Sequence, residues 1–426
     1  MSTTGYSKDF ERALEVGRPP NIKRLFPNSK ALIVSGKAAD RAASAKGGCM
    51  ILAANGRNHL TIRGVLAAAQ RANAVVIVEI ARSEGTYCPT TFWNIARQCD
   101  QVMNELHMTV PVVIHADHYG IKKPSDLKFA KQEIPTIFEA GITSIAIDAS
   151  HLPDDENLLS VLDLYPVIPD WSGLETEVGE IKGESGLSTP DEALFLIRGL
   201  NAHGISPEWI ALNNGTTHGI EATGAGINVE LTAKIHEALR PYAVSGAQHG
   251  TSGNSTEKLK AIAAGTRTTK ANVATAFQMI AWGLDVNDYG NAQFGPDGQF
   301  VKMKGAGMME ELWEEMTAYA ASKGLKGGDY KKLNLPFESA IMAQPTAIRE
   351  RMAKAVEDFA YGLIKNVFNS ADTAPFAIDA LLSAGSHDLG PKAGVIENPA
   401  EWTPEKIRER AKTLAQEAES AGNFDD

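Results

Sequence analysis

Short apolar runs rich in Val, Ile and Ala alternate along the chain with longer amphipathic segments. Such runs, bounded by turn residues, are typical of buried parallel strands, and the segments between them have helical periodicity. The pattern predicts eight strands, at Met50–Asn55, Ala74–Ile80, Val110–His115, Ser144–Asp148, Gly173–Val178, Trp209–Asn213, Tyr242–Gln248 and Thr268–Val273. The predicted helices between them are Leu60–Ala72, Thr91–Leu106, Ser125–Ala140, Glu156–Leu164, Thr189–Ala202, Glu230–Leu239 and Ser255–Ala264.

Regular alternation of strands and helices indicates parallel βαβ units. Eight strands is also the number that closes a (β/α)8 TIM barrel, which is the α/β fold we expect. A doubly wound open sheet is the alternative, but no Gly-x-Gly-x-x-Gly follows the first strand, which weakens a dinucleotide-binding interpretation.

The segments outside this pattern predict additions to the barrel. Residues 1–45 read as an N-terminal extension with helical pieces, residues 46–285 as the barrel core, and residues 286–426 as helical C-terminal additions. The last part contains predicted helices at Met308–Lys323, Thr346–Asn366 and Thr403–Ala421. We expect these helices to pack on the barrel or at a subunit interface.

Charge and cysteine content narrow the class of protein. The net charge of -11 argues against a general binder of nucleic acid or anionic membranes, although a local basic pocket for a phosphate remains open. Three cysteines without metal-finger spacing fit a reducing cytoplasm better than a disulfide scaffold. We expect no signal peptide and no membrane span, and therefore a cytoplasmic protein without nucleic-acid or membrane partners.

Polar residues crowd the ends of the predicted strands, where a TIM barrel carries its chemistry. The third strand runs into His115-Ala116-Asp117-His118. Alternation puts His115 and Asp117 on one face and His118 on the other, unless the strand ends there and the chain turns. The motif suits a metal site with an acid or base beside it, or else a pair of satisfied histidines at the barrel rim.

Three histidines from three strand ends form the candidate metal set: His118, His218 and His249. Three neutral imidazoles with one open position are a catalytic zinc pattern. Glu175 and Glu177 share one strand face, and if that face lines the barrel, each must be paired, metal-linked or protonated.

A phosphate site is predicted beside the metal. The Gly/Ser/Thr loop after His249, which contains Gly250 and Ser252, leads into a helix and can present backbone N–H groups to an anion. Asn272 and Thr275 on the next strand end could complete the cradle, since the last two strands commonly hold phosphate in this fold. An ordinary tight turn with a capping serine is the alternative.

The ordered set of motifs resembles the class II, metal-dependent fructose-bisphosphate aldolase family. The matching segments, in the family's order, are His115-Ala116-Asp117-His118, Leu174-Glu175-Thr176-Glu177-Val178-Gly179, Thr217-His218-Gly219, His249-Gly250-Thr251-Ser252-Gly253 and Lys270-Ala271-Asn272-Val273. The resemblance implies a TIM barrel and reversible zinc-dependent cleavage of a ketose (bis)phosphate, by default fructose 1,6-bisphosphate. The products would be dihydroxyacetone phosphate and an aldehyde such as glyceraldehyde 3-phosphate. It also implies a cytoplasmic homo-oligomer in sugar metabolism, with another divalent metal or an added monovalent cation as further cofactor candidates.

Roles carry over by position. His118, His218 and His249 resemble zinc ligands. Asp117 matches the acid that protonates the aldehyde oxygen in condensation, or accepts the C4 hydroxyl proton in cleavage, and Glu177 matches an acidic residue near the metal. The positions that match substrate and phosphate binding are Asn55, Gly219, Gly250, Ser252, Asn272 and Thr275.

Several departures from the family pattern concern the base and the aldehyde. Aligning the glycines of the acidic loop makes Glu184 the candidate proton-abstracting base. Ala81 and Ala274 stand where the family has a serine and an aspartate, and Arg82 or Lys331 would have to replace the arginine that usually holds the second phosphate. A related aldolase with another aldehyde, a metal-dependent hydrolase on the same barrel and a non-catalytic sugar-phosphate binder are the alternatives.

Overall fold

The computed structural model describes residues 7–179, 186–216, 226–251, 254–287, 290–296 and 298–421, with side chains up to residue 416. Eight parallel strands form a closed barrel in the order β4-β3-β2-β9-β8-β7-β6-β5, and β4 pairs with β5 to complete the ring. Their bounds are β2 Ile51–Asn55, β3 Val76–Ala81, β4 Val112–Gly120, β5 Ser144–Asp148, β6 Gly173–Val178, β7 Trp209–Leu212, β8 Ser245–Gln248 and β9 Thr268–Val273. The predicted TIM barrel and its eight strands are confirmed.

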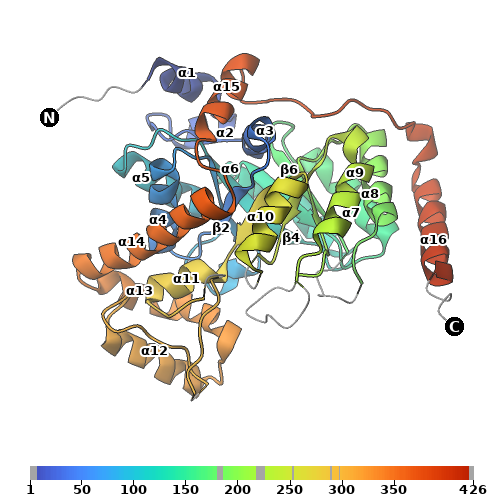
Figure 1. Ribbon diagram of the computed structural model, residues 1–426. Coiled ribbons are helices and arrows are strands. Elements are labelled where there is room, and N and C mark those ends of the chain that lie inside the picture. The colour runs from blue at the N-terminus through green and yellow to red at the C-terminus, as the bar shows by residue number, and fades with distance from the viewer. Residues whose placement is uncertain are drawn as a thin grey trace.

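Helices cover the outside of the barrel, and all but the last of them lie between two successive strands (Figure 1). They are α4 His59–Arg71, α5 Ile95–Glu105, α6 Asp126–Glu139, α7 Asp154–Leu164, α8 Pro190–Ala202, α9 Val229–Ala238, α10 Thr256–Gly265 and, after β9, α11 Thr275–Trp282. Side-chain caps at Asn58, Thr189 and Ser255 begin α4, α8 and α10, and Thr189 and Ser255 are also the residues at which the sequence predicted helix starts.

The N-terminal residues close one end of the barrel. Helices α1 Lys8–Val16 and α2 Pro20–Leu25 precede the short strand β1 Ile33–Val34, which pairs with β4, and then α3 Gly36–Lys46. A Cβ atom on Gly36 would lie 2.4 Å from Ser144 Oγ and 3.2 Å from Gly173 Cα, so α3 begins directly against the starts of β5 and β6. The sequence pattern did not predict α3.

The C-terminal residues add helices around the barrel. Helices α12 Glu310–Ser322, α13 Asn334–Ala343 and α14 Thr346–Gly362 follow α11, with a short 3-10 turn Gly327–Leu333 between the first two. Helix α15 Ala374–Ala384 lies near α1 and α3 at the closed end, and a long strap leads from it to α16 Pro404–Ala421 on the barrel's far side (Figure 1). The predicted helical additions are confirmed, whereas the three-part division at residues 45 and 285 stays a prediction.

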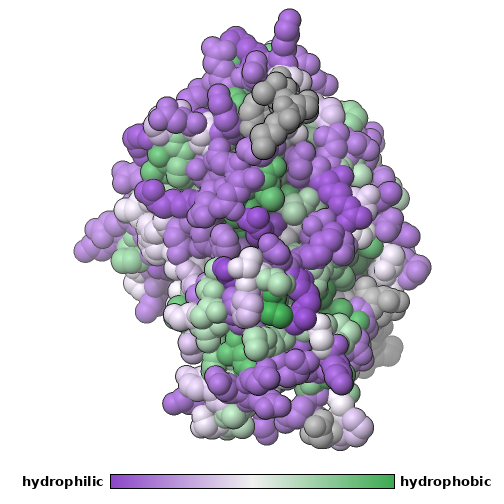
Figure 2. Space-filling view, turned by 90° about the vertical axis from the view of Figure 1, so that its left-hand side faces the viewer, coloured by the Kyte–Doolittle hydropathy of each residue, from purple (hydrophilic) through white to green (hydrophobic). Residues whose placement is uncertain are grey.

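The side of the molecule over α5 and the C-terminal helices is mostly polar, and apolar residues gather in its lower half, at the height of α11–α13 (Figure 2). Leu335 of α13 is 49% exposed. Among the described residues, no helix combines the length and apolar character that a membrane span requires.

The barrel interior changes character along its axis. Near the strand starts, Ile51, Ile77, Val113, Trp209 and Ala211 pack with α3 in an apolar cluster. Two to four residues further along the same strands, alternation returns the side chain to the interior, where polar groups such as Asn55, Glu79 and His115 now occur. The open end of the barrel, at the carboxyl ends of the strands, therefore carries the site.

Candidate active site

Strand β4 contains the structural feature that forms the centre of the site. The strand does not end at His115, as the sequence predicted, but continues to Gly120 with a bulge between Ala116 and Tyr119. His118, at φ +42°, is the residue that makes the bend. A bulge re-aims one side chain in a strand. Asp117 and His118 therefore both face the barrel mouth, although simple alternation would have put them on opposite faces.

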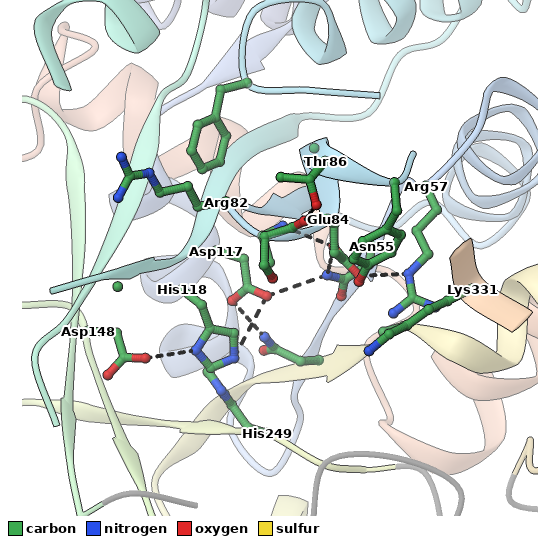
Figure 3. Close-up of a pocket in the computed structure, with 18 of the residues that line it drawn as sticks. Asn55, Arg57, Arg82, Glu84, Thr86, Asp117, His118, Asp148, His249 and Lys331 are labelled. Atoms are coloured by element: carbon green, nitrogen blue, oxygen red, sulfur yellow. Dashed lines mark hydrogen bonds and ion pairs between the residues drawn. The ribbon is translucent and has the colours of Figure 1, made fainter. Parts of the chain in front are cut away.

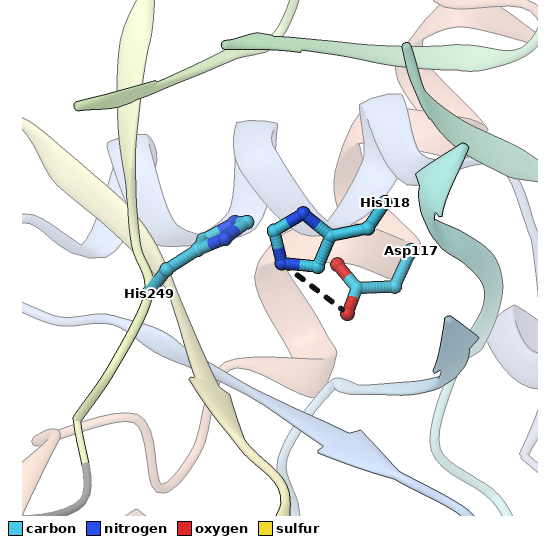
Figure 4. A group of neighbouring side chains, drawn as sticks. All are labelled: Asp117, His118 and His249. Atoms are coloured by element: carbon cyan, nitrogen blue, oxygen red, sulfur yellow. Dashed lines mark ion pairs between the residues drawn. The ribbon is translucent and has the colours of Figure 1, made fainter. Parts of the chain in front are cut away.

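His249 meets this pair from the end of β8. Its ring lies 4.4 Å from the His118 ring, centre to centre, at 87°, and His118 Nε2 is 4.0 Å from Asp117 Oδ2 (Figure 4). One nitrogen or oxygen atom from each of the three side chains lies within 4.8 Å of the others. The structure thus brings together two of the three predicted metal ligands and the predicted acid.

Two further carboxylates surround His118. Its Nδ1 lies 3.0 Å from Glu177 Oε1 and 3.4 Å from Asp148 Oδ2. Burial opposes a charged imidazole, but Glu177 and Asp117 outweigh it and raise the pKa of His118 well above its usual value. Burial also raises the pKa of Glu177, and the nearby Asp148 adds to the effect. This group is therefore rich in negative charge and attracts a cation.

Below this level, Lys270 of β9 lies at the centre of the barrel. Its Nζ is 2.8 Å from Glu175, 3.1 Å from Glu79 and 3.9 Å from Asp117, and all four side chains are buried. Burial and the nearby Asp117 raise the pKa of Glu79 well above its usual value. Burial alone would raise the pKa of Asp117, but His118 and Lys270 outweigh it and lower it to about 2. Asp117 is therefore ionised at neutral pH.

Glu175 links this level to the histidines. Its Oε1 lies 2.7 Å from His249 Nε2, and its Oε2 lies 3.4 Å from His115 Nε2. Because Nε2 of His249 is held by this carboxylate, Nδ1 is the nitrogen through which His249 would bind a metal. His115 Nδ1 also contacts Ser144 Oγ at 2.9 Å, so both ring nitrogens of His115 face polar groups inside the barrel.

A cavity of about 890 Å³ opens above these groups (Figure 3). The described residues predicted to bind substrate, Asn55, Gly250, Asn272 and Thr275, all line it. The side-chain amides of Asn55 and Asn272 also donate to Asp117, at 3.4 and 3.1 Å. Four other predicted site residues, Glu184, His218, Gly219 and Ser252, lie outside the described residues.

The structure adds site residues that sequence reasoning did not select. Arg57 and Glu84 form a buried ion pair of 2.6 Å in the cavity wall, and Asp148 and Lys270 contact the central groups. Asp148 is the last residue of β5 and Lys270 lies within β9, and a charged residue in a buried strand is a signal that the sequence offers. Arg57 lies in the loop after β2 and Glu84 in a 3-10 turn after β3, and nothing in their local pattern separates them from surface charges. Arg82 lines the cavity too, paired with Glu133 at 2.9 Å.

The donor set fits a divalent metal. Imidazole nitrogens and carboxylate oxygens are the ligands that zinc takes in catalytic sites. His118, His249, Asp117 and Glu177 offer such atoms within two overlapping groups, and three carboxylates around His118 supply the negative charge that a cation requires.

Comparison with known proteins agrees with this geometry. The family model "Fructose-bisphosphate aldolase class-II" matches residues 38–325. The chain is 29% identical over 134 residues to the fructose-bisphosphate aldolase of Staphylococcus aureus (strain COL), which is 31% of this chain and 43% of that protein. It therefore spans less than half the length of the staphylococcal relatives. The fructose-bisphosphate aldolase of Mycoplasma pneumoniae is 27% identical over 242 residues, which is 56% of this chain and 78% of that protein.

Solved structures share the fold. The YdjI aldolase from Escherichia coli K12 has a TM-score of 0.52 at 20% identity, and the alignment covers 80% of this chain and 99% of that one. Fructose-bisphosphate aldolase from Campylobacter jejuni has the same TM-score at 18% identity, with 80% and 97% covered. At these identities the likeness establishes the barrel alone. The family match covers well over half of the chain, and the chain therefore belongs to the class II fructose-bisphosphate aldolase family.

Proposed function

We propose that the chain catalyses reversible, zinc-dependent aldol cleavage of a ketose phosphate to dihydroxyacetone phosphate and an aldehyde. Fructose 1,6-bisphosphate is the default substrate, and glyceraldehyde 3-phosphate the matching aldehyde. One observation carries the proposal. The β4 bulge brings an ionised acid, Asp117, and a histidine, His118, together with His249 at one cavity that the predicted substrate-binding residues line.

The metal would be held by His118 and His249, with His218 as the third proposed ligand and Glu177 beside it. When bound, it polarises the ketone carbonyl and so stabilises the carbanion that cleavage produces. Another divalent metal in this position, and a monovalent cation as a further cofactor, belong to the same proposal.

In cleavage, Asp117 accepts the proton of the C4 hydroxyl group, and the C3–C4 bond breaks to release the aldehyde. The ketone half keeps the electron pair as its enediolate and takes a proton at C3, for which Glu184 is the proposed donor. Asp117 suits its role because it is ionised, and the amides of Asn55 and Asn272 fix its orientation. Gly219, Gly250, Ser252, Asn272 and Thr275 are the proposed contacts of the ketone phosphate.

The charges around Arg82, at the end of the cavity away from Arg57, favour an alternative to glyceraldehyde 3-phosphate as the aldehyde. Arg82 lies across the cavity from Arg57 and Lys331, with Asp117 and His118 between them (Figure 3). Its guanidinium is already paired with Glu133, and Asp126 also lines this end. A phosphate there would meet a neutralised cation, so an aldehyde without phosphate is the alternative substrate.

Proton exchange tests the ketone half without knowledge of the aldehyde. The protein would be incubated with dihydroxyacetone phosphate in heavy water, and loss of one hydroxymethyl proton followed by NMR with and without a chelator. Exchange that the chelator abolishes and added zinc restores supports the proposal. No exchange in the zinc-loaded protein would contradict it. Cleavage of fructose 1,6-bisphosphate and fructose 1-phosphate would then be compared to identify the aldehyde.

The quaternary and cellular parts of the proposal follow from the family. We expect a cytoplasmic homo-oligomer that acts on sugar phosphates in central carbohydrate metabolism. Size-exclusion chromatography with light scattering measures the oligomeric state directly.

A further inference from the structure

Arg57, in the loop after β2, is held in a fixed orientation at the cavity wall. Its side chain is buried, its Nε donates to Glu84 at 2.6 Å, and its Nη1 donates to Thr275 Oγ1 at 3.3 Å and Gln278 Oε1 at 3.2 Å. Burial opposes the charged guanidinium, but Glu84 outweighs it and raises the pKa of Arg57 further. Arg57 is therefore a permanent, oriented cation.

Glu84 positions this cation relative to the reacting groups. One carboxylate oxygen takes the Arg57 bond, while the other accepts the Asn55 amide at 2.7 Å and the backbone N–H of Ala81 at 2.9 Å. The same Asn55 amide reaches Asp117 at 3.4 Å. A short chain of bonds thus connects Arg57 through Glu84 and Asn55 to the proposed acid.

The C-terminal addition supports Arg57 from behind. Gln278 of α11, which accepts from Arg57, also accepts from the Asn334 side chain of α13 at 2.6 Å. Asn334 in turn accepts from Asn58, next to Arg57 in the chain, at 3.0 Å. This support leaves Arg57 little freedom to move away from the cavity.

The surroundings of Arg57 fit an anion. Thr275 is the first residue of α11, and its neighbour Ala274, the N-cap, makes no side-chain cap hydrogen bond. Gly250, Asn272, Ala274 and Lys331 line the cavity together with Arg57. Backbone N–H groups at a helix start attract a phosphate, and a guanidinium adds charge and a second donor. With Glu84 as the counter-charge of Arg57, the ammonium of Lys331 leaves this end with a positive balance.

We propose that Arg57 binds the phosphate group of the ketone half, with Glu84 as its positioning residue. Among the described residues, Nε and Nη1 carry the internal bonds of Arg57, which leaves Nη2 for the ligand. The inference rests on the proposed function, because it identifies the part of the substrate that the site selects. Phosphate recognition then depends on a charged side chain from the loop after β2 as well as on the Gly/Ser/Thr loop after His249.

The test compares a phosphorylated and an unphosphorylated ketone. Deuterium exchange of dihydroxyacetone phosphate and of dihydroxyacetone would be measured for the zinc-loaded protein, and binding of inorganic phosphate by calorimetry. Loss of one charge-assisted bond predicts a roughly 30-fold lower kcat/KM for dihydroxyacetone phosphate in Arg57→Gln. The exchange rate of dihydroxyacetone should stay within about twofold of the wild-type rate, because only the phosphate contact is lost. The affinity for inorganic phosphate should fall in parallel with kcat/KM for dihydroxyacetone phosphate.

Arg57→Gln leaves Glu84 buried without its cation, so the neutral pair Arg57→Gln/Glu84→Gln provides a second variant that keeps the cluster uncharged. It should show the same loss of selectivity. The matched control is Arg63→Gln on α4, which removes an ion pair of equal length, 2.6 Å, outside the cavity.

The outcomes separate the two hypotheses. Equal losses for both ketones, or unchanged selectivity and phosphate binding in both variants, would show that Arg57 is only structural and would overturn this inference. If the wild-type protein exchanged neither ketone, the proposed function would be overturned instead. The affinity of wild type and variants for inorganic phosphate would still test the role of Arg57.

Discussion

Glu208 at the closed end of the barrel predicts a measurable pH dependence of stability. Its side chain is fully buried, and its Oε2 accepts the backbone N–H of Leu174 at 2.8 Å. Burial outweighs the nearby Lys392 ammonium and raises the pKa of Glu208 to about 7. Lys392 is engaged elsewhere, with Asp40 at 2.6 Å and the Glu208 carbonyl at 2.8 Å.

The sign follows from proton linkage. The unfolded chain releases the Glu208 proton near pH 4.5, while the folded chain keeps it until about pH 7. Between these values the folded state binds more protons, so stability falls as pH rises and then levels off above the folded pKa. The pKa difference is worth about 3 kcal/mol, most of which falls between pH 5 and pH 8.

Glu208→Gln removes this ionisation and keeps an oxygen for the Leu174 N–H group. The free energy of unfolding of variant and wild type would be measured by urea denaturation near pH 5 and near pH 8. The variant should gain about 2–3 kcal/mol relative to wild type between the two conditions, whatever its baseline cost. Glu139→Gln, at an exposed position on α6, is the control and should give no such gain. A gain below about 1 kcal/mol would refute the reasoning, because Glu208 would then ionise in the folded state as it does in the unfolded one.

Three further predictions concern the site. Asp117→Asn should slow carbon–carbon cleavage by roughly 10²–10⁴-fold while preserving most dihydroxyacetone phosphate exchange, and equal losses of both would remove its separate role. His249→Ala should lose bound zinc, measured by elemental analysis, together with activity, and a metal-free variant with full activity would refute the ligand assignment. Lys270→Met leaves Glu175 and Asp117 buried without their cation, so unfolding should become easier by about 3–5 kcal/mol, and a urea midpoint equal to that of wild type would contradict this.

The barrel was predictable because its strands are buried on both sides. Continuous apolar runs such as Val112–Ile114 predict a buried strand whatever its packing partners are. Side-chain caps likewise indicated the helix starts at Thr189 and Ser255. Helix α3 escaped prediction because its face is built of small residues, chiefly alanine, that give weak periodicity. Its role at the closed end appears only when the starts of β5 and β6 are adjacent in space.

The site was predictable at its centre and not at its edge. Asp117 and His118 lie near the carboxyl end of β4 and His249 follows β8, so their convergence follows from the barrel itself. The bulge that turns His118 toward Asp117 depends on a register shift against β5, which is a property of two strands and not of one. Arg57 and Glu84 become a pair only through the distance between two loops, and Lys331 reaches the cavity from the C-terminal addition.

The distribution of charge along the barrel axis explains where a metal belongs. At the closed end Lys392 balances Asp40, and Glu208 is protonated below about pH 7. In the middle, Lys270 faces Glu175 and Glu79, and the raised pKa of Glu79 favours its neutral form. Both levels are thus neutralised by groups of the chain itself.

At the open end, Asp117, Asp148 and Glu177 surround His118 and His249, and no Lys or Arg side chain forms an ion pair with Asp148 or Glu177 in the described chain. Buried carboxylates without a cation are costly, and a proton on His118 compensates only one of them. The proposed divalent ion would supply the remaining charge in one place, next to the cavity. Removing the proposed metal should therefore abolish turnover and also raise the pKa of these three carboxylates, because their negative charge is then left without a compensating cation.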